Sequence, residues 1–413
     1  MIRAIRRAGS WFEALAPGQA PLTPHRHRTR PIARRYATLL ACLVVPLAVG
    51  ELGAAPFSFI VLDDVHYAAG EEYDWQQIEQ SHEAEAKRVR RNADRSRQTF
   101  LPLLRELKEQ AETAAPKPAA IFSCGDLVHG GPAVRADLHC RNFIRRFESA
   151  GIPMPLFNAN GNHEMAEAGM EDAYDRNFLP FLSRQLGRPL GARHYSTDLG
   201  NAHFILLDGL PPGRDGGDHE ARVWALGDPQ WAWLEADLEA NKAKDHIFVF
   251  THATLWPLGN GDGLYGGEPH RHRALVSLLL KYNVRAVFAG HKHMNSATVY
   301  AEDGRQLVQM IPNSHIDATD VPPKETQRPP YSAETVVPKL RGKWDQWGRD
   351  LVALYQSGII HHEQTPGLSG YFVVAVDGPD VTVRMYRGTG KKLFREYGLD
   401  RDPATGATRF RVE

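Results

Sequence analysis

Residues 57–66 carry the sequence FSFIVLDDVH, in which a run of mostly apolar residues leads directly into two aspartates and a histidine. A short apolar run bounded by polar residues or glycine is typical of a buried β-strand. Five further segments share this design: Ala119–Ser123, Met154–Phe157, His203–Leu207, Ile247–Phe250 and Val284–Phe288. The pattern therefore predicts a series of buried strands whose carboxyl ends carry polar side chains.

Segments with helical periodicity separate these strands. Residues 74–113 contain a charged stretch and then Phe100, Leu103 and Leu107 at helical spacing. The same pattern recurs at 135–149, 231–238 and 272–282. Alternating strands and helices predict an α/β protein, and open sheets of that class bind ligands at the carboxyl ends of their strands. Aspartate and glycine also make ordinary turns, but turns alone do not account for five histidines at four strand ends.

The composition argues against one class of partner. The 413 residues include 49 basic and 49 acidic side chains, so the formal net charge is +0. Proteins dedicated to nucleic acids usually carry a basic excess, so a nuclease is disfavoured. Three cysteines make no disulfide framework, and Cys124, at the end of an apolar strand, is expected to be a small buried residue. The oligomeric state is left open.

The two ends of the chain differ from its centre. Residues 1–35 are rich in arginine and precede an apolar run at 36–50 and small residues at 53–55, an order typical of a secretory signal. The run is shorter than the roughly 20 residues of a membrane span, so we expect export to the periplasm or the extracellular space, with a membrane anchor as the alternative. The predicted divisions are an Arg-rich N-terminal region at 1–55, one domain at 56–395 with an insertion at 310–368, and a tail at 396–413.

Polar motifs at the strand ends occur in a fixed order. They are Asp64-x-His66, Gly125-Asp126, Gly161-Asn162-His163-Glu164, His252 and Gly290-His291-x-His293. Each fragment alone is a weak signal, whereas the ordered set on successive strand ends is much less likely to arise by chance. Imidazoles, carboxylates and an amide carbonyl suit Mn, Fe, Co, Ni or Zn. A carboxylate such as Asp126 can bridge two ions, and a pair of ions about 3.5–4 Å apart supplies hydroxide and clamps an in-line displacement at phosphorus.

This ordered set resembles that of the calcineurin-like metallophosphoesterases, and the resemblance covers most of residues 57–293. It implies a two-sheet β-sandwich flanked by helices, and metal-dependent hydrolysis of a phosphate monoester or diester by a metal-bridging hydroxide. It also implies two divalent transition-metal ions, one held by Asp64, His66, Asp126 and His293 and the other by Asp126, Asn162, His252 and His291.

The resemblance assigns other roles to the residues that follow Asn162. It implies that His163 is no ligand, because the matching histidine in relatives contacts the phosphate or protonates the leaving oxygen. For Glu164, a role in supporting the ligands and a bland role as a solvated acid or a helix N-terminal charge both remain open. Three further histidines, His246, His270 and His272, match no motif and are expected at the surface.

One departure separates this sequence from the purple acid phosphatases of the superfamily. They carry a tyrosine three residues after the bridging aspartate, where this chain has His129, so an iron–tyrosinate pair is not expected. The pattern looks more like the bacterial cyclic-nucleotide phosphodiesterase and general phosphoesterase branch. A non-catalytic scaffold, as in retromer-type members, is the alternative, but it predicts gaps in the ligand set and none is found. We expect substrate selectivity to lie in the loops 165–195, 210–225 and 255–272 and in the insertion.

Overall fold

The computed structural model describes residues 55–81, 83–165, 169–210, 226–256, 269–312, 314, 358–366, 370–387 and 392–413, which all belong to the compact unit Glu51–Glu413. The predicted export signal lies outside the described residues. So does most of the predicted insertion, including the helix expected at 336–357.

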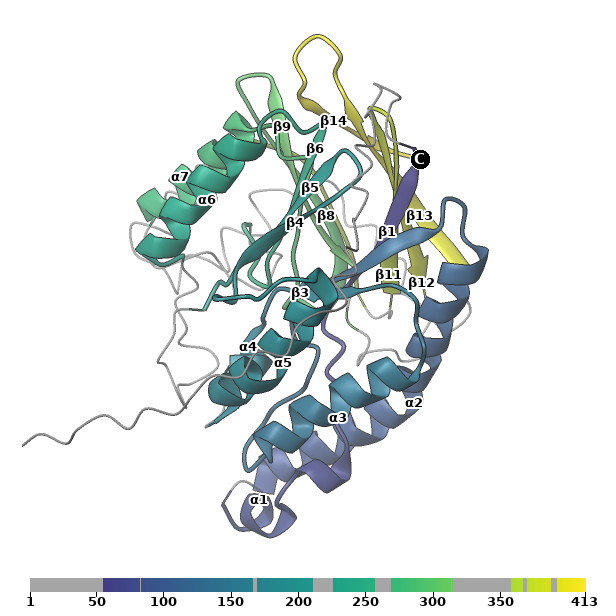
Figure 1. Cartoon of the computed structure of the whole chain (residues 1–413), viewed down its shortest axis with the longest axis vertical. Helices are drawn as coiled ribbons and strands as arrows, with labels where there is room; N and C mark the ends of the chain where they lie inside the picture. Colours follow the sequence, from purple (N-terminus) through teal and green to yellow (C-terminus); the bar gives the residue numbers. More distant parts are fainter. Residues whose placement is uncertain are drawn as a thin grey trace, which may run out of the picture. The chain divides into compact units, whose positions relative to one another are not determined.

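Two seven-stranded sheets form the centre of the described unit (Figure 1). The first has the order β14-β13-β12-β11-β1-β2-β3, with β1 Phe57–Leu62, β2 Pro118–Ser123, β3 Leu156–Asn158, β11 Gly370–Asp377, β12 Asp380–Arg387, β13 Lys392–Arg401 and β14 Thr408–Val412. The second has the order β10-β8-β9-β7-β6-β5-β4, with β4 Tyr195–Leu199, β5 Ala202–Leu206, β6 His246–Phe250, β7 Ala286–Phe288, β8 Met294–Glu302, β9 Arg305–Pro312 and β10 Ile359–Pro366. The predicted two-sheet α/β fold is confirmed.

Parallel strands form one side of the first sheet and the middle of the second. In the first sheet β1 pairs with β2 and β2 with β3, and in the second sheet β5, β6 and β7 pair in the same way. Parallel neighbouring strands run in the same direction, so their carboxyl ends lie at the same end of the sheet. The loops after β1, β2 and β3 therefore emerge together, as do those after β6 and β7, and these five loops carry the predicted motifs.

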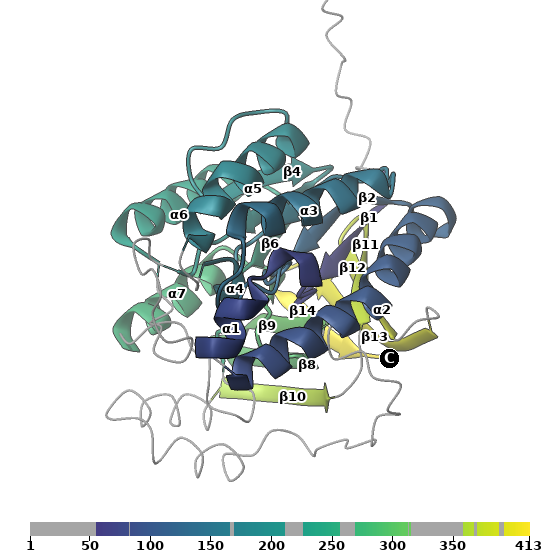
Figure 2. The ribbon, with the colours of Figure 1, turned by 90° about the horizontal axis from the view of Figure 1, so that it is seen from below.

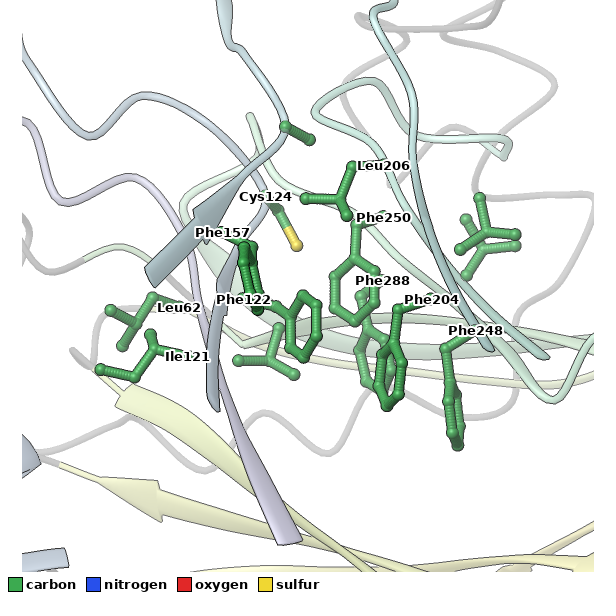
Figure 3. Packing of buried hydrophobic residues seen from close by; sticks show 14 of the residues in the cluster. Leu62, Ile121, Phe122, Cys124, Phe157, Phe204, Leu206, Phe248, Phe250 and Phe288 are labelled. Atoms are coloured by element: carbon green, nitrogen blue, oxygen red, sulfur yellow. The ribbon is translucent and has the colours of Figure 1, made fainter. Parts of the chain in front are cut away.

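Aromatic side chains fill the space between the sheets (Figure 3). Phe122 of the first sheet stacks on Phe204 of the second, with ring centroids 4.5 Å apart, and Phe59 meets Phe204 edge to face at 5.0 Å. Phe250, also of the second sheet, stacks on Phe122 with ring centroids 4.7 Å apart. Truncating a buried phenylalanine to alanine typically destabilises a protein by about 3–5 kcal/mol. This cluster therefore holds the two sheets, and the loops at their ends, in one relative position.

Helices cover the outer faces of both sheets (Figures 1 and 2). The helical elements are η1 Gly70–Glu72, α1 Trp75–Ser81, α2 Glu83–Thr113, α3 Ala136–Ser149, α4 Asn162–Met165, α5 Met170–Leu186, α6 Asp228–Asn241 and α7 Pro269–Lys281. Helices α2, α3 and α5 lie along the first sheet, and α6 and α7 lie beside the second. Among the described residues, no helix combines the length and the apolar character that a membrane crossing requires.

The C-terminal residues differ from the sequence-based expectation. Residues 396–413 are expected as a loose tail, but residues 396–401 belong to β13 and residues 408–412 to β14, and the two strands pair with Leu399 opposite Phe410. Tyr397 and Leu399 are buried, whereas charged residues flank them along the strand. The alternation of apolar and charged residues thus produces a half-buried strand pair at the edge of the sheet.

Two histidines expected at the surface are buried. His246 accepts a hydrogen bond from Arg285 Nε at its Nδ1 (3.1 Å) and donates one from Nε2 to the Gly378 carbonyl (2.7 Å), and His272 donates from Nε2 to the Leu255 carbonyl (2.6 Å). Burial lowers the pKa of each to about 4, so both rings are neutral. The surface prediction for them is therefore wrong, while the side chain of His270 lies outside the described residues. Cys124 and Cys140 are buried free thiols, as expected for Cys124.

Candidate metal centre

The loops after five strands bring all eight predicted site residues into one region. Asp64 and His66 follow β1, Asp126 follows β2, Asn162 and His163 follow β3, His252 follows β6, and His291 and His293 follow β7. Three of these residues, His163, His291 and His293, are partly exposed. The others are buried: Asp64, His66, Asp126, Asn162 and His252. The site therefore has a closed floor and a side that a substrate can approach.

A first group joins the loops after β1 and β7. Asp64, His66 and His293 offer ligand atoms within 4.8 Å of one another. His66 Nε2 lies 3.0 Å from His293 Nε2, and each of these nitrogens lies 3.5 Å from Asp64 Oδ1. Two imidazole nitrogens and a carboxylate oxygen converging in this way match the ligand preferences of a divalent transition metal.

A second group lies next to the first. Asp126, His252 and His291 again place ligand atoms within 4.8 Å of one another. Asn162 Oδ1 lies 3.0 Å from His252 Nε2 and 3.0 Å from His291 Nδ1. Asp126 Oδ2 connects the two groups, because it lies 3.2 Å from His252 Nε2 and 3.7 Å from His66 Nε2.

The carboxylates of Asp64 and Asp126 are buried, and three of their four oxygen atoms lack a hydrogen-bond donor among the described residues. Both oxygens of Asp64 and the Oδ2 atom of Asp126 accept no hydrogen bond from any described residue. Burial alone would raise the pKa of both groups, but His293 beside Asp64 and His252 beside Asp126 outweigh that effect and hold each pKa below its usual range. A buried, ionised carboxylate that lacks donors requires a cation, so the residues present fit a metal centre.

The backbone of the site is held in an unusual conformation. Five of the predicted ligands have positive φ angles: Asp64 (45°), His66 (48°), Asp126 (51°), His291 (72°) and His293 (47°). Residues other than glycine seldom adopt this region, and such conformations cluster at functional sites. Close backbone approach is also required at Gly161, where a Cβ atom would lie 2.2 Å from Asp126 Oδ1.

Glu164 supports the site from below. Its Oε2 accepts hydrogen bonds from the backbone N–H groups of Asp126 (2.9 Å) and Gly161 (2.7 Å), and its Oε1 accepts one from Val128 (3.2 Å). The side chain is fully buried, so the interpretation as a solvated acid is wrong. Glu164 instead ties the loop after β2 to the loop after β3.

His163 is held at two points beside the metal groups. Its backbone N–H donates to Asp126 Oδ1 (2.8 Å), and its Nδ1 donates to the backbone carbonyl of His129. Its ring lies edge-on to that of His66, with centroids 4.6 Å apart. The arrangement places His163 against the first group, at the partly exposed side of the site.

Three buried polar residues around the site escape the motif-based analysis. Asp63 has no hydrogen-bond donor among the described residues, and a Cβ atom at Gly290 would lie 2.0 Å from its Oδ1. Asn92 of α2 contacts the ring of His129. Glu72 accepts hydrogen bonds from Tyr67 Oη (2.9 Å) and from Asn142 Nδ2 (2.7 Å). No motif marks these positions, although Asn92 interrupts the apolar face of α2 at helical spacing from Val89 and Ser96.

Comparison with known proteins extends these observations. The family model described as calcineurin-like phosphoesterase matches residues 57–295. The mouse serine/threonine-protein phosphatase CPPED1 is 26% identical over 219 residues, which are 51% of this chain and 64% of the mouse protein. Purple acid phosphatase 21 of Arabidopsis thaliana is 28% identical over 158 residues, 37% of this chain and 33% of that protein. The chain thus spans less than two thirds of the length of these curated relatives.

A solved structure supports the similarity at the level of the fold. Purple acid phosphatase PPD1 from yellow lupin seeds superimposes with a TM-score of 0.50 at 12% identity, covering 85% of this chain and 55% of that chain. At this identity the match concerns the arrangement of sheets and helices. It carries no information about the substrate of this chain.

Proposed function

This chain belongs to the calcineurin-like phosphoesterase family, and from that premise we propose that it hydrolyses a phosphate ester at the strand-end site with the help of two divalent transition-metal ions. The observation that carries the proposal is the set of buried carboxylate oxygens of Asp64 and Asp126, which lack hydrogen-bond donors among the described residues and face imidazole nitrogens. Mn, Fe, Zn, Co and Ni all suit this donor set.

We assign each of the two groups of residues described above to one ion. Asp64, His66, Asp126 and His293 would hold one ion, and Asp126, Asn162, His252 and His291 the other, with Asp126 shared. When bound, such a pair of ions polarises the phosphoryl oxygens and lowers the pKa of a water molecule that attacks phosphorus in line. The closed floor of the site excludes bulk water from the other side.

His163 is the proposed proton donor to the leaving oxygen. The hydrogen bond from its Nδ1 to the His129 carbonyl fixes the plane of the ring, so we assign proton transfer to Nε2. Its partial exposure lets a substrate reach it. General acid assistance of this kind contributes about 10²–10⁴-fold to the rate.

The substrate class is to be determined with a panel of esters. Chelator-treated protein reconstituted with each of the five metals is assayed on a phosphoserine peptide, on nitrophenyl phosphate, on bis-nitrophenyl phosphate and on a cyclic nucleotide. We include the peptide because the CPPED1 relatives are named as serine/threonine-protein phosphatases. The expected result is metal-dependent hydrolysis of at least one ester. Activity that persists unchanged in Asp64→Asn would identify a contaminant, and absence of hydrolysis in every metal-loaded sample would contradict the proposal.

A further inference from the structure

We propose that Asn92 and His129 form a directed hydrogen-bond chain that holds His66 in the ring tautomer required for metal binding, which makes both of them positioning residues for the first ion. The inference rests on the proposed metal-dependent function. It adds two residues to the site. One of them, Asn92, belongs to helix α2, which contains none of the motifs.

The contacts run in a line from helix α2 to the metal group. Asn92 Nδ2 lies 2.9 Å from His129 Nε2, and His129 Nδ1 lies 3.2 Å from His66 Nδ1. On the opposite side of its ring, His66 Nε2 faces His293 and Asp64 at 3.0 and 3.5 Å. Asn92 and His129 are buried, with 7% and 2% of their surface exposed, so water contributes little to these contacts.

The direction of the chain follows from the valence of the imidazole ring. A metal at His66 Nε2 uses the lone pair there, so the proton of the neutral ring must lie on Nδ1. That N–H then donates to His129 Nδ1, and the neutral ring of His129 carries its own proton on Nε2. The Nε2–H group needs an acceptor, and among the described residues the side chain recorded within hydrogen-bond distance of Nε2 is the amide of Asn92, whose oxygen can accept. Metal binding thus requires that Oδ1 of Asn92 points toward His129. In the structure Nδ2 of Asn92 lies 2.9 Å from His129 Nε2, so the amide must turn by half a rotation.

The other buried histidine ligand shows why His66 depends on such a chain. His252 donates from Nδ1 to the backbone carbonyl of Cys124 at 2.8 Å, which presents Nε2 to the second group. A carbonyl can only accept, so the tautomer of His252 is determined by the backbone. The Nδ1 atom of His66 instead faces an imidazole, which can donate or accept, and its tautomer is determined only when Asn92 orients His129.

His129 is well placed to transmit this orientation. Its backbone N–H donates to the Tyr67 carbonyl (2.9 Å), and its own carbonyl accepts from His163 Nδ1. Its ring stacks on that of His163, with centroids 4.9 Å apart. Movement of His129 would therefore disturb both a proposed ligand and the proposed proton donor, which gives its position a functional consequence.

Three variants of the full-length protein test the direction of the hydrogen bonds from His66 through His129 to Asn92. Asn92→Asp offers only acceptor oxygens and preserves the proposed direction, whereas Asn92→Leu removes the acceptor. Gln110→Leu is the matched control, because Gln110 is a buried amide on the same helix that donates to Tyr371 Oη at 3.1 Å, away from the site. Calorimetric titration of the chelator-treated proteins with Zn²⁺ or Mn²⁺ gives the number of ions and their affinities, and thermal unfolding without metal gives the stability.

We expect Asn92→Leu to lower the binding affinity for one of the two ions about 10–100-fold, the usual effect of removing a residue that orients a ligand. Asn92→Asp should bind within a few-fold of wild type or more tightly, even if the buried charge lowers its melting temperature. Gln110→Leu should lose stability and keep both affinities. Equal weakening in Asn92→Asp and Asn92→Leu, or wild-type affinity in Asn92→Leu, would overturn the inference. Failure of wild type itself to bind metal would overturn the proposed function instead.

Discussion

The carboxylate of Glu164 accepts a hydrogen bond of 2.9 Å from the backbone N–H of Asp126, the residue that faces both metal groups. The two residues belong to loops that follow different strands, β2 and β3. The position of Asp126 is thus supported by a side chain that is itself fully buried. A carboxylate is suited to this task because it can accept several backbone N–H groups at once.

Replacement of Glu164 should therefore destabilise the protein and loosen the site. Glu164→Ala leaves three buried N–H groups without an acceptor, and we expect a loss of about 2–5 kcal/mol in the free energy of unfolding. Glu164→Gln keeps one acceptor oxygen and should lose less. Urea unfolding of the metal-free proteins measures both, with the exposed Glu83→Ala as the control. Alanine and wild-type curves that coincide would contradict the supporting role.

Asp126→Asn tests whether one carboxylate serves two ions. The amide has the same shape but only one acceptor oxygen and no charge, so it cannot bridge two cations. We expect hydrolysis to be abolished and the metal content to fall from two ions per chain. Elemental analysis of purified protein gives the stoichiometry, and circular dichroism establishes that the variant is folded. Unchanged stoichiometry in a folded, soluble variant would rule out the bridging role.

The role of His163 predicts a dependence on the leaving group. His163→Ala should keep both ions, because this ring is not assigned as a ligand. An alkoxide needs a proton as it departs, whereas a nitrophenolate leaves readily without one, so alkyl esters should slow by about 10²–10⁴-fold and nitrophenyl esters much less. Rates on both ester types in wild type and variant provide the comparison. Equal losses would indicate that His163 binds the phosphoryl oxygens instead.

His203 predicts a pH-dependent contribution to stability away from the site. Its ring lies between two carboxylates, with Nδ1 2.6 Å from Asp198 Oδ1 and Nε2 2.7 Å from Asp237 Oδ2. Burial opposes protonation, but the two carboxylates outweigh it and raise the pKa of His203 above its usual value. The stabilisation is therefore present in full below the unfolded-state pKa of about 6.5 and is lost as the pH rises through the higher folded-state pKa.

The measurement is the difference in unfolding free energy between wild type and His203→Gln across pH 5.5–9. We expect it to be largest at the acidic end and to shrink as the pH rises. His246→Gln supplies a control of opposite sign, because burial lowers the pKa of His246 to about 4 and its contribution is lost as the pH falls. A pH-independent difference for His203 would show that the ring acts by packing alone.

The six strands predicted from apolar runs, and most helices, were accessible from the sequence because their apolar patterns are strong. Residues 165–195, assigned to a loop, contain α5, although Tyr174, Phe178 and Leu182 recur every four residues and are buried. Strand β8 escaped recognition because its buried face includes Ser296 and Thr298, which interrupt the apolar pattern. Polar residues on a buried face thus conceal an element from any analysis based on hydrophobicity.

The site divides in a similar way. The residues predicted as ligands could be singled out because each lies shortly after a strand, where short motifs are visible. Asn92 lies 37 residues before its partner His129 in a different element, so only the packing of α2 against the loop after β2 brings them together. Long-range contacts between residues outside any motif have no local signature, and the residues that orient the ligands therefore appear only in three dimensions.

The left-handed backbone at Asp64, His66, Asp126, His291 and His293 has an evolutionary consequence. Each such conformation typically costs a protein about 1–3 kcal/mol, and glycine, which adopts it without strain, would relieve that cost. A lineage released from selection for catalysis would gain thermal stability by exchanging these very residues. Loss of activity and gain of stability would then lie along the same mutational path.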